Sequence, residues 1–181
     1  IRLAKEKPNT LNYASSGIGT PMHLGGVLFG HVAGVEMTHV PYRSSSQSVT
    51  ALLAGDVQFY IGTVPGAPQL EQDNKLRILS SAGPKRAPTL PGVMSAAEAG
   101  LPNFEISNWW ALAAPRGTPQ PVIDALSREF RSVLTDQTIK ERLLQINMVA
   151  IGNRPREFAD QMKRESDMWR DVIKSANITV N

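Results

Sequence analysis

The chain has 181 residues, of which 41% are hydrophobic, and it carries 19 Lys and Arg against 16 Asp and Glu, with no cysteine. This length allows one domain or two small ones with a buried core, while the lack of cysteine excludes disulfides and thiolate metal sites. The formal charge of +3 is spread among acidic residues, which is typical of solvated helix faces and argues against nucleic acid as a partner.

The first residues are typical of the end of a helix. Residues 1–7 mix apolar and charged side chains, and Pro8 ends the pattern. The chain opens at Ile1 with neither an initiator methionine nor a signal peptide. We therefore expect a fragment or a processed product, in which 1–7 completes a helix that begins upstream.

A strand, a polar loop and a strongly capped helix follow. The apolar run 11–14 predicts a short strand, and the Ser- and Gly-rich run 15–19 predicts a tight turn. Thr20 fits the N-cap of a helix, Pro21 fits its first position, and Gly34 ends it. The predicted helix therefore covers roughly residues 20–33.

This turn has the chemistry of an anion site. Free N–H groups at the helix start point back at the loop, and Gly17 and Gly19 let a ligand approach the backbone. The loop lacks the Lys of a P-loop and the third glycine of a dinucleotide fingerprint. A carboxylate held by neutral donors is therefore the preferred ligand, and a well-made turn with no ligand is the alternative.

Strands and helices then alternate. Strands are predicted at 36–40, 57–61 and 76–80, with a helix at 48–54 ended by Gly55 and a short helix ending at Gln72. This order predicts an α/β fold with a parallel sheet whose loops gather at one rim, where ligands bind. Tyr42 and Thr63 stand at strand ends on that rim. The candidate ligand-binding residues are Ser15, Ser16, Gly17, Gly19, Thr20, His23, Tyr42 and Thr63.

The rest of the chain is predicted to be an extended connection followed by helices. A small helix is expected around 95–99, and 104–114 is an extended apolar run with two tryptophans. A helix starting at Thr118-Pro119 carries an apolar stripe over 122–134, and helices at 137–145 and about 155–176 follow, with a short strand at 148–151 between them. We expect the apolar stripes to be core.

These patterns occur in the order of a known family. Residues 13–24 resemble its Ser-Gly-rich loop and its helix with an early His-Leu, and 39–43 resemble its His-Val-Pro-Tyr-Lys segment. Residues 86–93 and 98–102 resemble its Arg-x-Pro-x-Leu-Pro-x-Val…Glu-Ala-Gly stretch, and 109–119 resemble a passage ending in Ala-Pro-x-Gly-Thr-Pro. The chain thus resembles the periplasmic solute-binding receptors of tripartite tricarboxylate transporters, called Bug or TctC receptors.

The resemblance implies a type II periplasmic-binding-protein (Venus flytrap) architecture. It places 1–7 at the end of a first-lobe helix, 8–107 in a complete second α/β lobe with the ligand loops, and 108–181 in a crossover strand and a helical return segment. The family's opening strand and Pro-Phe-x-x-Gly-Gly loop have no match here. We therefore expect the chain to lack about a third of such a receptor and to self-associate through the surfaces that this exposes.

The resemblance also implies a function. Such receptors bind a small organic carboxylate, here a di- or tricarboxylate or a related acid, in the periplasm and deliver it to the membrane components of the transporter. No enzymatic activity, cofactor or metal is expected. The third loop lacks the acidic or amide residue often found before it in relatives, which disfavours an amino-acid ligand.

Two other functions remain open. The chain could be the ligand-sensing domain of a transcriptional regulator, since such domains share the two-lobed architecture. It could also be an acyl hydrolase with Ser15 or Ser16 as nucleophile and His23 as base, although the sequence has no G-x-S-x-G elbow. His31 and His39 are expected to be structural, and no pair of histidines has metal-ligand spacing.

Overall fold

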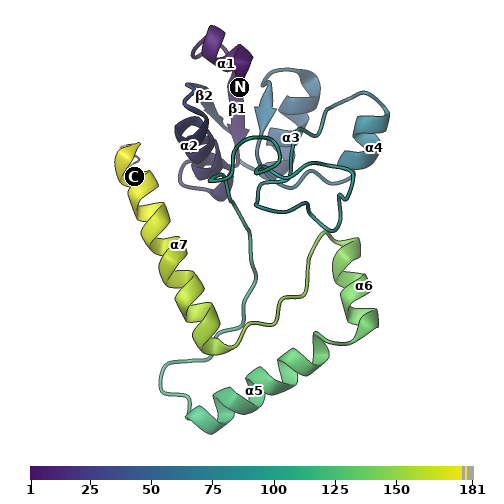
Figure 1. Ribbon diagram of the computed structural model, residues 1–181, viewed down its shortest axis with the longest axis vertical. Helices are drawn as coiled ribbons and strands as arrows, with labels where there is room; N and C mark the ends of the chain where they lie inside the picture. Colours follow the sequence, from purple (N-terminus) through teal and green to yellow (C-terminus); the bar gives the residue numbers. More distant parts are fainter. Residues whose placement is uncertain (177, 179–181) are drawn as a thin grey trace. The chain divides into compact units, whose positions relative to one another are not determined.

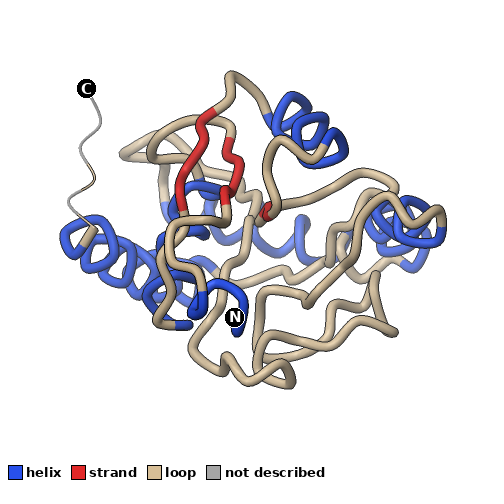
Figure 2. Tube along the Cα trace, turned by 90° about the horizontal axis from the view of Figure 1, so that it is seen from above, coloured by secondary structure: helices blue, strands red, loops and turns tan. Residues whose placement is uncertain are grey.

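A three-stranded parallel sheet organises the first half of the chain (Figures 1 and 2). In this computed structural model, which describes residues 1–176 and 178, β1 (Asn12–Ser15) lies between β2 (Thr38–Pro41) and β3 (Phe59–Tyr60). The strands pair in parallel, with Tyr13 opposite His39 and Ala14 opposite Tyr60. The predicted α/β fold with a parallel sheet is therefore confirmed.

Two helices make the crossovers between these strands. α2 (Pro21–Ala33) joins β1 to β2, and α3 (Ser45–Ala54) joins β2 to β3. Both end as predicted, because Gly34 and Gly55 adopt the left-handed conformation at the helix C-caps with φ of 62° and 85°. The strand order 2-1-3 makes the winding direction reverse at β1, and ligands of open α/β sheets bind outside the carboxyl ends of strands at such a point.

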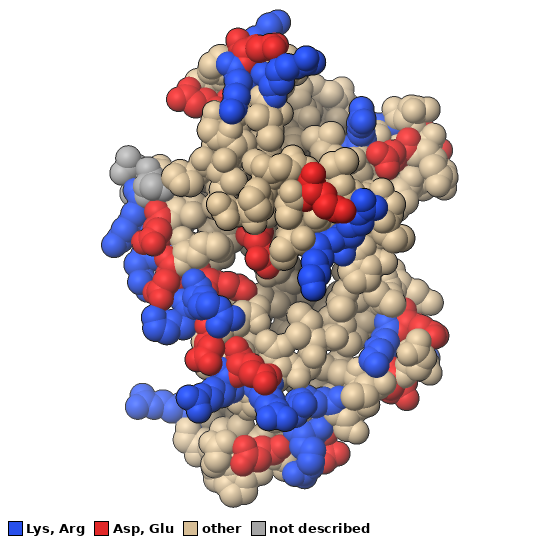
Figure 3. Space-filling view, viewed as in Figure 1, with Lys and Arg blue, Asp and Glu red and all other residues tan. Residues whose placement is uncertain are grey.

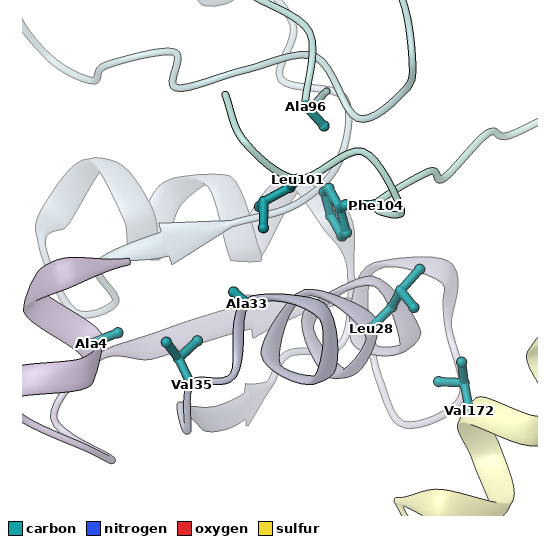
Figure 4. Close-up of a cluster of buried hydrophobic side chains, with 8 residues drawn as sticks. All are labelled: Ala4, Leu28, Ala33, Val35, Ala96, Leu101, Phe104 and Val172. Atoms are coloured by element: carbon teal, nitrogen blue, oxygen red, sulfur yellow. The ribbon is translucent and has the colours of Figure 1, made fainter. Parts of the chain in front are cut away.

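The buried apolar side chains of the described residues form two clusters. The larger gathers residues from α1 (Arg2–Glu6), α2, the connection after residue 95 and the last turns of α7 (Pro155–Ser175) (Figure 4). Its members are Ala4, Leu28, Ala33, Val35, Ala96, Leu101, Phe104 and Val172. The smaller contains Ala14, Ala51 and Val57, with α3 packed on it. These clusters fix the positions of α2 and α3 and hence of the loops before them.

Three short predictions differ from the structure. Residues 76–80 form no strand, because the Ile78 amide donates to the Glu71 side chain and Leu79 is 58% exposed; only an isolated bridge joins Ser81 to Ser95. Residues 95–99 form turns, and 148–151 form no strand. Short apolar runs become strands only when a neighbouring strand accepts their hydrogen bonds.

The connection at 83–102 is held by one polar cluster. Arg86 contacts both carboxylate oxygens of Glu98 at 3.0 and 2.9 Å, and it also donates to the Pro91 carbonyl. Glu98 and Ser95 exchange hydrogen bonds between side chain and backbone, in the manner of a capping box. The Arg86 guanidinium holds the pKa of Glu98 at about 2. This motif of the family resemblance therefore has a structural role in the chain.

The C-terminal part is helical, with α4 (Ala67–Gln72) standing between it and the sheet in sequence. α5 (Gln120–Val133), α6 (Gln137–Gln145) and α7 (Pro155–Ser175) lie close to their predicted bounds. α5 begins two residues after Thr118, whose hydroxyl donates to the Pro115 carbonyl instead of capping the helix. The α5 stripe predicted as core is exposed: Val122, Leu126, Phe130 and Val133 are 46–52% accessible.

The chain divides into two compact units, one of Ile1–Asn108 with Trp169–Asn181 and one of Trp109–Met168. The predicted assignment of 1–7, 8–107 and 108–181 to the lobes of a receptor stays a prediction, and its residues 177 and 179–181 lie outside the described part. On the face drawn in Figure 3, charges of both signs are intermixed over α5 and α7, as expected for solvated helices. Among the helices described, none has the length and apolar character to cross a bilayer.

Candidate functional site

The loop between β1 and α2 forms a tight turn held by its own hydrogen bonds. Gly17 has φ of 129° and Gly19 has φ of 77°, backbone conformations that disfavour residues with a side chain. The Thr20 amide and the Thr20 hydroxyl both reach the Gly17 carbonyl, at 3.4 and 2.7 Å. The two predicted glycines are therefore required by the backbone of this loop.

Thr20 is the N-cap of α2, as predicted, but its hydroxyl does not cap the helix. It donates to the Gly17 carbonyl, and a hydroxyl donating there does not accept from the second or third helical amide. Pro21 has no amide hydrogen, and within the described residues the amides of Met22 and His23 have no hydrogen-bond acceptor. The start of α2 therefore presents two free N–H groups at the positive end of a helix of 13 residues.

A cluster of two histidines lies directly behind this loop. Tyr13, Ser15 and His39 share one face of the sheet, because side chains two positions apart point the same way and Tyr13 pairs with His39. α2 covers this face and brings in His23, whose ring stacks on that of His39 with centroids 4.0 Å apart and planes at 20°. The Tyr13 ring also stacks on the His39 ring, with ring centroids 5.0 Å apart. The close approach of α2 depends on Gly26, since a Cβ there would overlap the Tyr13 ring.

Each histidine ring is hydrogen-bonded to the loop. His39 Nε2 lies 2.6 Å from Ser15 Oγ, which also accepts from the Gly17 amide at 3.1 Å and donates to the Gly17 carbonyl at 3.0 Å. These three contacts are compatible when His39 carries its proton on Nε2. His23 Nδ1 accepts from the Gly19 amide at 3.1 Å, so its proton is on Nε2.

Both rings are neutral at pH 7. Burial lowers the pKa of His23, while burial together with the charge of His23 lowers the pKa of His39 to about 4. Burial also raises the pKa of Tyr13 to about 12. The face beneath the loop is therefore uncharged, and any anion bound at the loop meets neutral donors.

The pairing of Ser15 with a histidine has the distance of a nucleophile and its base, although the histidine is His39 and not the predicted His23. Ser15 is 0% exposed, and its hydroxyl is already used by the Gly17 backbone. Within the described residues, His39 contacts Ser15, Tyr13 and His23, and none of these is the carboxylate that orients a catalytic histidine. This geometry favours a role in shaping the loop.

The outer side of the loop has weakly bound hydroxyls. Ser16 Oγ donates to the Met22 sulfur at 3.0 Å, and the Ser45 hydroxyl lies 3.8 Å from the same sulfur. A thioether is a weak acceptor, so either hydroxyl can turn to a stronger one. Ser45 begins α3, whose N-cap Ser44 accepts from the Gln47 amide at 3.2 Å. The starts of α2 and α3 thus meet at Met22.

The other two predicted residues follow the neighbouring strands. The Tyr42 amide donates to the Ser15 carbonyl at 2.8 Å, and its ring packs on the smaller core cluster. Thr63 is exposed in the loop after β3, with no side-chain partner among the described residues. The structure thus brings Ser15, Ser16, Gly17, Gly19, Thr20 and His23 together, with the Tyr42 backbone bonded to this group.

Two further residues at the site, His39 and Tyr60, were not among the predicted ligand-binding residues. The parallel register of β1 and β2 places His39 beside Ser15, and this register could have been inferred from the predicted strand order. The Tyr60 hydroxyl is buried without a hydrogen-bond partner in the described part of the chain. This hydroxyl is near the end of β3, and a Cβ added to Gly62 would be 2.8 Å from it. Burial raises its pKa, against a smaller opposing effect of the Ser45 hydroxyl.

In the part of the chain that the structure describes, the other candidate positions have less suitable chemistry than this loop. Among the described residues there is no group of three His, Asp or Glu side chains placed to hold a metal ion. A hollow lined by Asn9, His31, Glu36 and Met37 with backbone of α2 lies at the amino ends of β1 and β2, which is the opposite edge of the sheet. The loop edge therefore remains the candidate ligand site.

The sequence matches the family model described as "Tripartite tricarboxylate transporter family receptor" over residues 1–178. It is 36% identical over 182 residues to a UPF0065 protein from the tcbD-tcbE intergenic region of Pseudomonas sp. (strain P51), covering 100% of this chain and 54% of that relative. The chain thus spans about half the length of this relative.

Two solved structures share the fold. R. palustris Rpa4515 with adipate superimposes with a TM-score of 0.81 at 31% identity, over 98% of this chain and 60% of that one. MatC (Rpa3494) from Rhodopseudomonas palustris with bound malate gives a TM-score of 0.72 at 28% identity, over 95% of this chain and 60% of that one. Because the family model covers nearly the whole sequence, the chain belongs to the tripartite tricarboxylate transporter receptor family.

Proposed function

We propose that this chain carries one jaw of an extracytoplasmic receptor for a small organic carboxylate. The ligand carboxylate lies at the loop between β1 and α2, with the loops at 42–45 and 62–65 completing the rim. The observation that carries this proposal is the pair of unpartnered amides of Met22 and His23 at the start of α2. Two solved relatives were obtained with a dicarboxylate, adipate or malate, which supports this ligand class.

The residues of the loop have different parts in this proposal. Ser16 contributes a hydroxyl that leaves the Met22 sulfur for the stronger carboxylate acceptor. Gly17 and Gly19 adopt the positive φ that the turn requires, and they let the ligand approach the backbone closely. Ser15 and His23 act behind the loop, because their polar atoms are bonded to the Gly17 and Gly19 backbone. Tyr42 and Thr63 contact the remainder of the ligand.

The wider role follows from the family. The receptor acts in the periplasm and passes its ligand to the membrane components of a tripartite tricarboxylate transporter, without chemical change. The exposed apolar face of α5, with Leu126 and Phe130 about half accessible, is available for self-association of the chain. Binding by this chain is expected to be weak, because one jaw buries only part of a ligand that two jaws enclose.

Amide chemical shifts test the ligand and its place. We expect adipate and malate to shift the amides of residues 16–23, and neutral adipamide to leave them unchanged, because the helix start favours a charged oxygen. Gly17→Ala should abolish the shifts, since φ of 129° strains any side chain. Gly92→Ala is the matched control, because a Cβ there meets no atom within 4 Å and its φ is ordinary.

Three results contradict the proposal. One is equal shifts with adipate and adipamide, which points to binding without charge recognition. Another is shifts at the opposite sheet edge around Asn9 and Glu36. The third is a Gly17→Ala variant that binds like Gly92→Ala.

A further inference from the structure

The two stacked imidazoles behind the loop can each take up a proton, and the proposed ligand site does not by itself require this. We propose that His23 and His39 form a positioning device that holds the loop of residues 16–20 in its anion-binding conformation only while both rings are neutral. Acidification then opens the loop and weakens carboxylate binding. The inference about affinity rests on the function proposed above, whereas the inference about the loop does not.

Each ring holds a different point of the loop. His39 holds its beginning through Ser15 Oγ at 2.6 Å, and this hydroxyl in turn holds both backbone groups of Gly17. His23 holds its end by accepting the Gly19 amide at 3.1 Å. The stack at 4.0 Å joins the two rings and hence the two points. Independently of the histidines, the loop is held by the contacts of Thr20 with the Gly17 carbonyl and by the weak bond from Ser16 Oγ to the Met22 sulfur.

Protonation removes these contacts at defined atoms. A proton on His23 Nδ1 turns the acceptor of the Gly19 amide into a donor that faces another donor. A proton on His39 Nδ1 leaves its Nε2 bond to Ser15 but places a positive ring 4.0 Å from His23. Burial disfavours the charged form of each ring, so protonation of either one opposes the stack. Two charged rings at this distance also repel each other.

Among the described residues, the elements around the stack carry no charged side chain that offsets this effect. The elements packed around the stack are β1, β2, α2, α3 and β3, and their titratable groups are Tyr13, His23, His31, His39 and Tyr60. His31 is exposed in the last turn of α2, and the two tyrosines are neutral. Glu36 and Arg43 flank β2 with exposed side chains. The lowered pKa of both rings agrees with this uncharged, partly buried setting.

The size of the effect follows from proton linkage. If His39 regains its ordinary pKa of 6.5 when the loop opens and has a pKa of about 4 when it is closed, the closed-to-open ratio falls by about thirtyfold between pH 7.5 and 5. The additional contribution of His23 has the same sign, because its pKa is also lowered in the closed loop. Affinity for a carboxylate falls by up to the same factor.

The first experiment uses the full chain without ligand. Imidazole nitrogen and glycine amide resonances are followed by NMR from pH 8 to 4. We expect His23 and His39 to titrate below the ordinary histidine pKa of 6.5, and the Gly17 and Gly19 amides to move with them. In His23→Asn, whose Oδ1 accepts a hydrogen bond and does not titrate, the Gly19 amide should stay unchanged until His39 is protonated. His31→Asn is the control and should behave like the original chain.

Two outcomes of this experiment overturn the proposal. The loop amides could remain unchanged while the two imidazoles titrate, which would uncouple the stack from the loop. Alternatively, both imidazoles could titrate at the ordinary histidine pKa of 6.5. Where His23→Asn fails to fold, His39→Gln supplies the same comparison, because its amide nitrogen reaches Ser15 and does not titrate.

The second experiment measures adipate affinity at pH 7.5 and 5. The double variant His23→Asn/His39→Gln reports the part of the pH dependence that belongs to adipate itself. The original chain should lose more affinity than this reference, by up to about thirtyfold. Equal losses within twofold overturn the coupling of the stack to binding. Absence of adipate binding at both pH values contradicts the proposed function instead, while the ligand-free titration still decides whether the stack holds the loop.

Discussion

The sheet unit (Ile1–Asn108 with Trp169–Asn181) and the helical unit (Trp109–Met168) differ in how far their apolar side chains are buried. In the sheet unit, α2 has five buried residues although its apolar side chains are not confined to one face. In the helical unit, α5 and α6 are strongly amphipathic, yet neither has a buried residue in the described structure. All buried hydrophobic residues described lie outside 109–168. Amphipathic sequence therefore identifies a helix and its apolar face, but burial of that face requires a partner surface.

The difference in burial also distinguishes the surroundings of the candidate ligand loop from the helical unit. The loop after β1 is held by β2 and α2, whose positions are fixed by two buried clusters. It is complete within this chain. The helical unit is held together mainly by exposed or half-exposed contacts, such as Trp109 with Phe158 and Glu165. We therefore expect mutations to affect the two units by different mechanisms.

The largest effect should distinguish two helical leucines. Leu28 is 5% exposed in α2, whereas Leu126 is 51% exposed in α5. Leu28→Ala should lower the free energy of unfolding by about 3 kcal/mol, and Leu126→Ala by less than about 1 kcal/mol. Urea denaturation at two protein concentrations measures both. Equal losses that grow with concentration would mean that the α5 face is buried between copies in solution.

The second effect concerns the contact between α2 and the sheet. Gly26→Ala should cost about 2 to 3 kcal/mol, because the added Cβ overlaps the Tyr13 ring and α2 must move outward. Gly92→Ala, at a position with open space, should change the stability by less than about 0.5 kcal/mol. Thermal denaturation followed by circular dichroism compares the two variants. A pair of equal melting temperatures would refute the close packing of α2.

The third effect depends on pH. The pKa of His39 is lowered from 6.5 to about 4 in the folded chain, so the unfolded chain binds more protons between these values. The contribution of His39 to the free energy of unfolding is therefore fully present above pH 6.5. It decreases as the pH falls and is lost below about pH 4. The loss is on the order of 1 to 2 kcal/mol, because solvent screens this partly exposed ring. His39→Gln should flatten this part of the stability profile, and an unchanged slope would contradict the assignment.

The smallest effect compares the two side-chain caps. Ser44 caps α3 in the sheet unit, and Asp136 caps α6 in the helical unit by accepting from the Ile139 amide at 3.1 Å. Ser44→Ala should lower the free energy of unfolding by about 1 kcal/mol. Asp136→Ala should reduce helicity without moving the midpoint of unfolding, because α6 has no buried residue. A shift of the midpoint as large as that of Ser44→Ala would show that both units unfold together.

Local sequence determined most of the helices and the outline of the loop. Pro21 and Gly34 bound α2, Gly55 ends α3, and α6 covers the predicted residues 137–145. These features depend on the backbone preferences of single residues and on periodic apolar positions, which act over a few residues. Gly17 and Gly19 belong to the predicted tight turn, and both adopt positive φ.

Only the tertiary structure decided which side chains meet. The register of β1 and β2 brought His39 to Ser15, a residue 24 positions away, and α2 placed His23 on the same ring. Residues 76–80 formed no strand for want of a partner, and the apolar stripe of α5 stayed exposed. Such outcomes depend on hydrogen bonds and contacts between distant segments, and no local pattern contains their geometry.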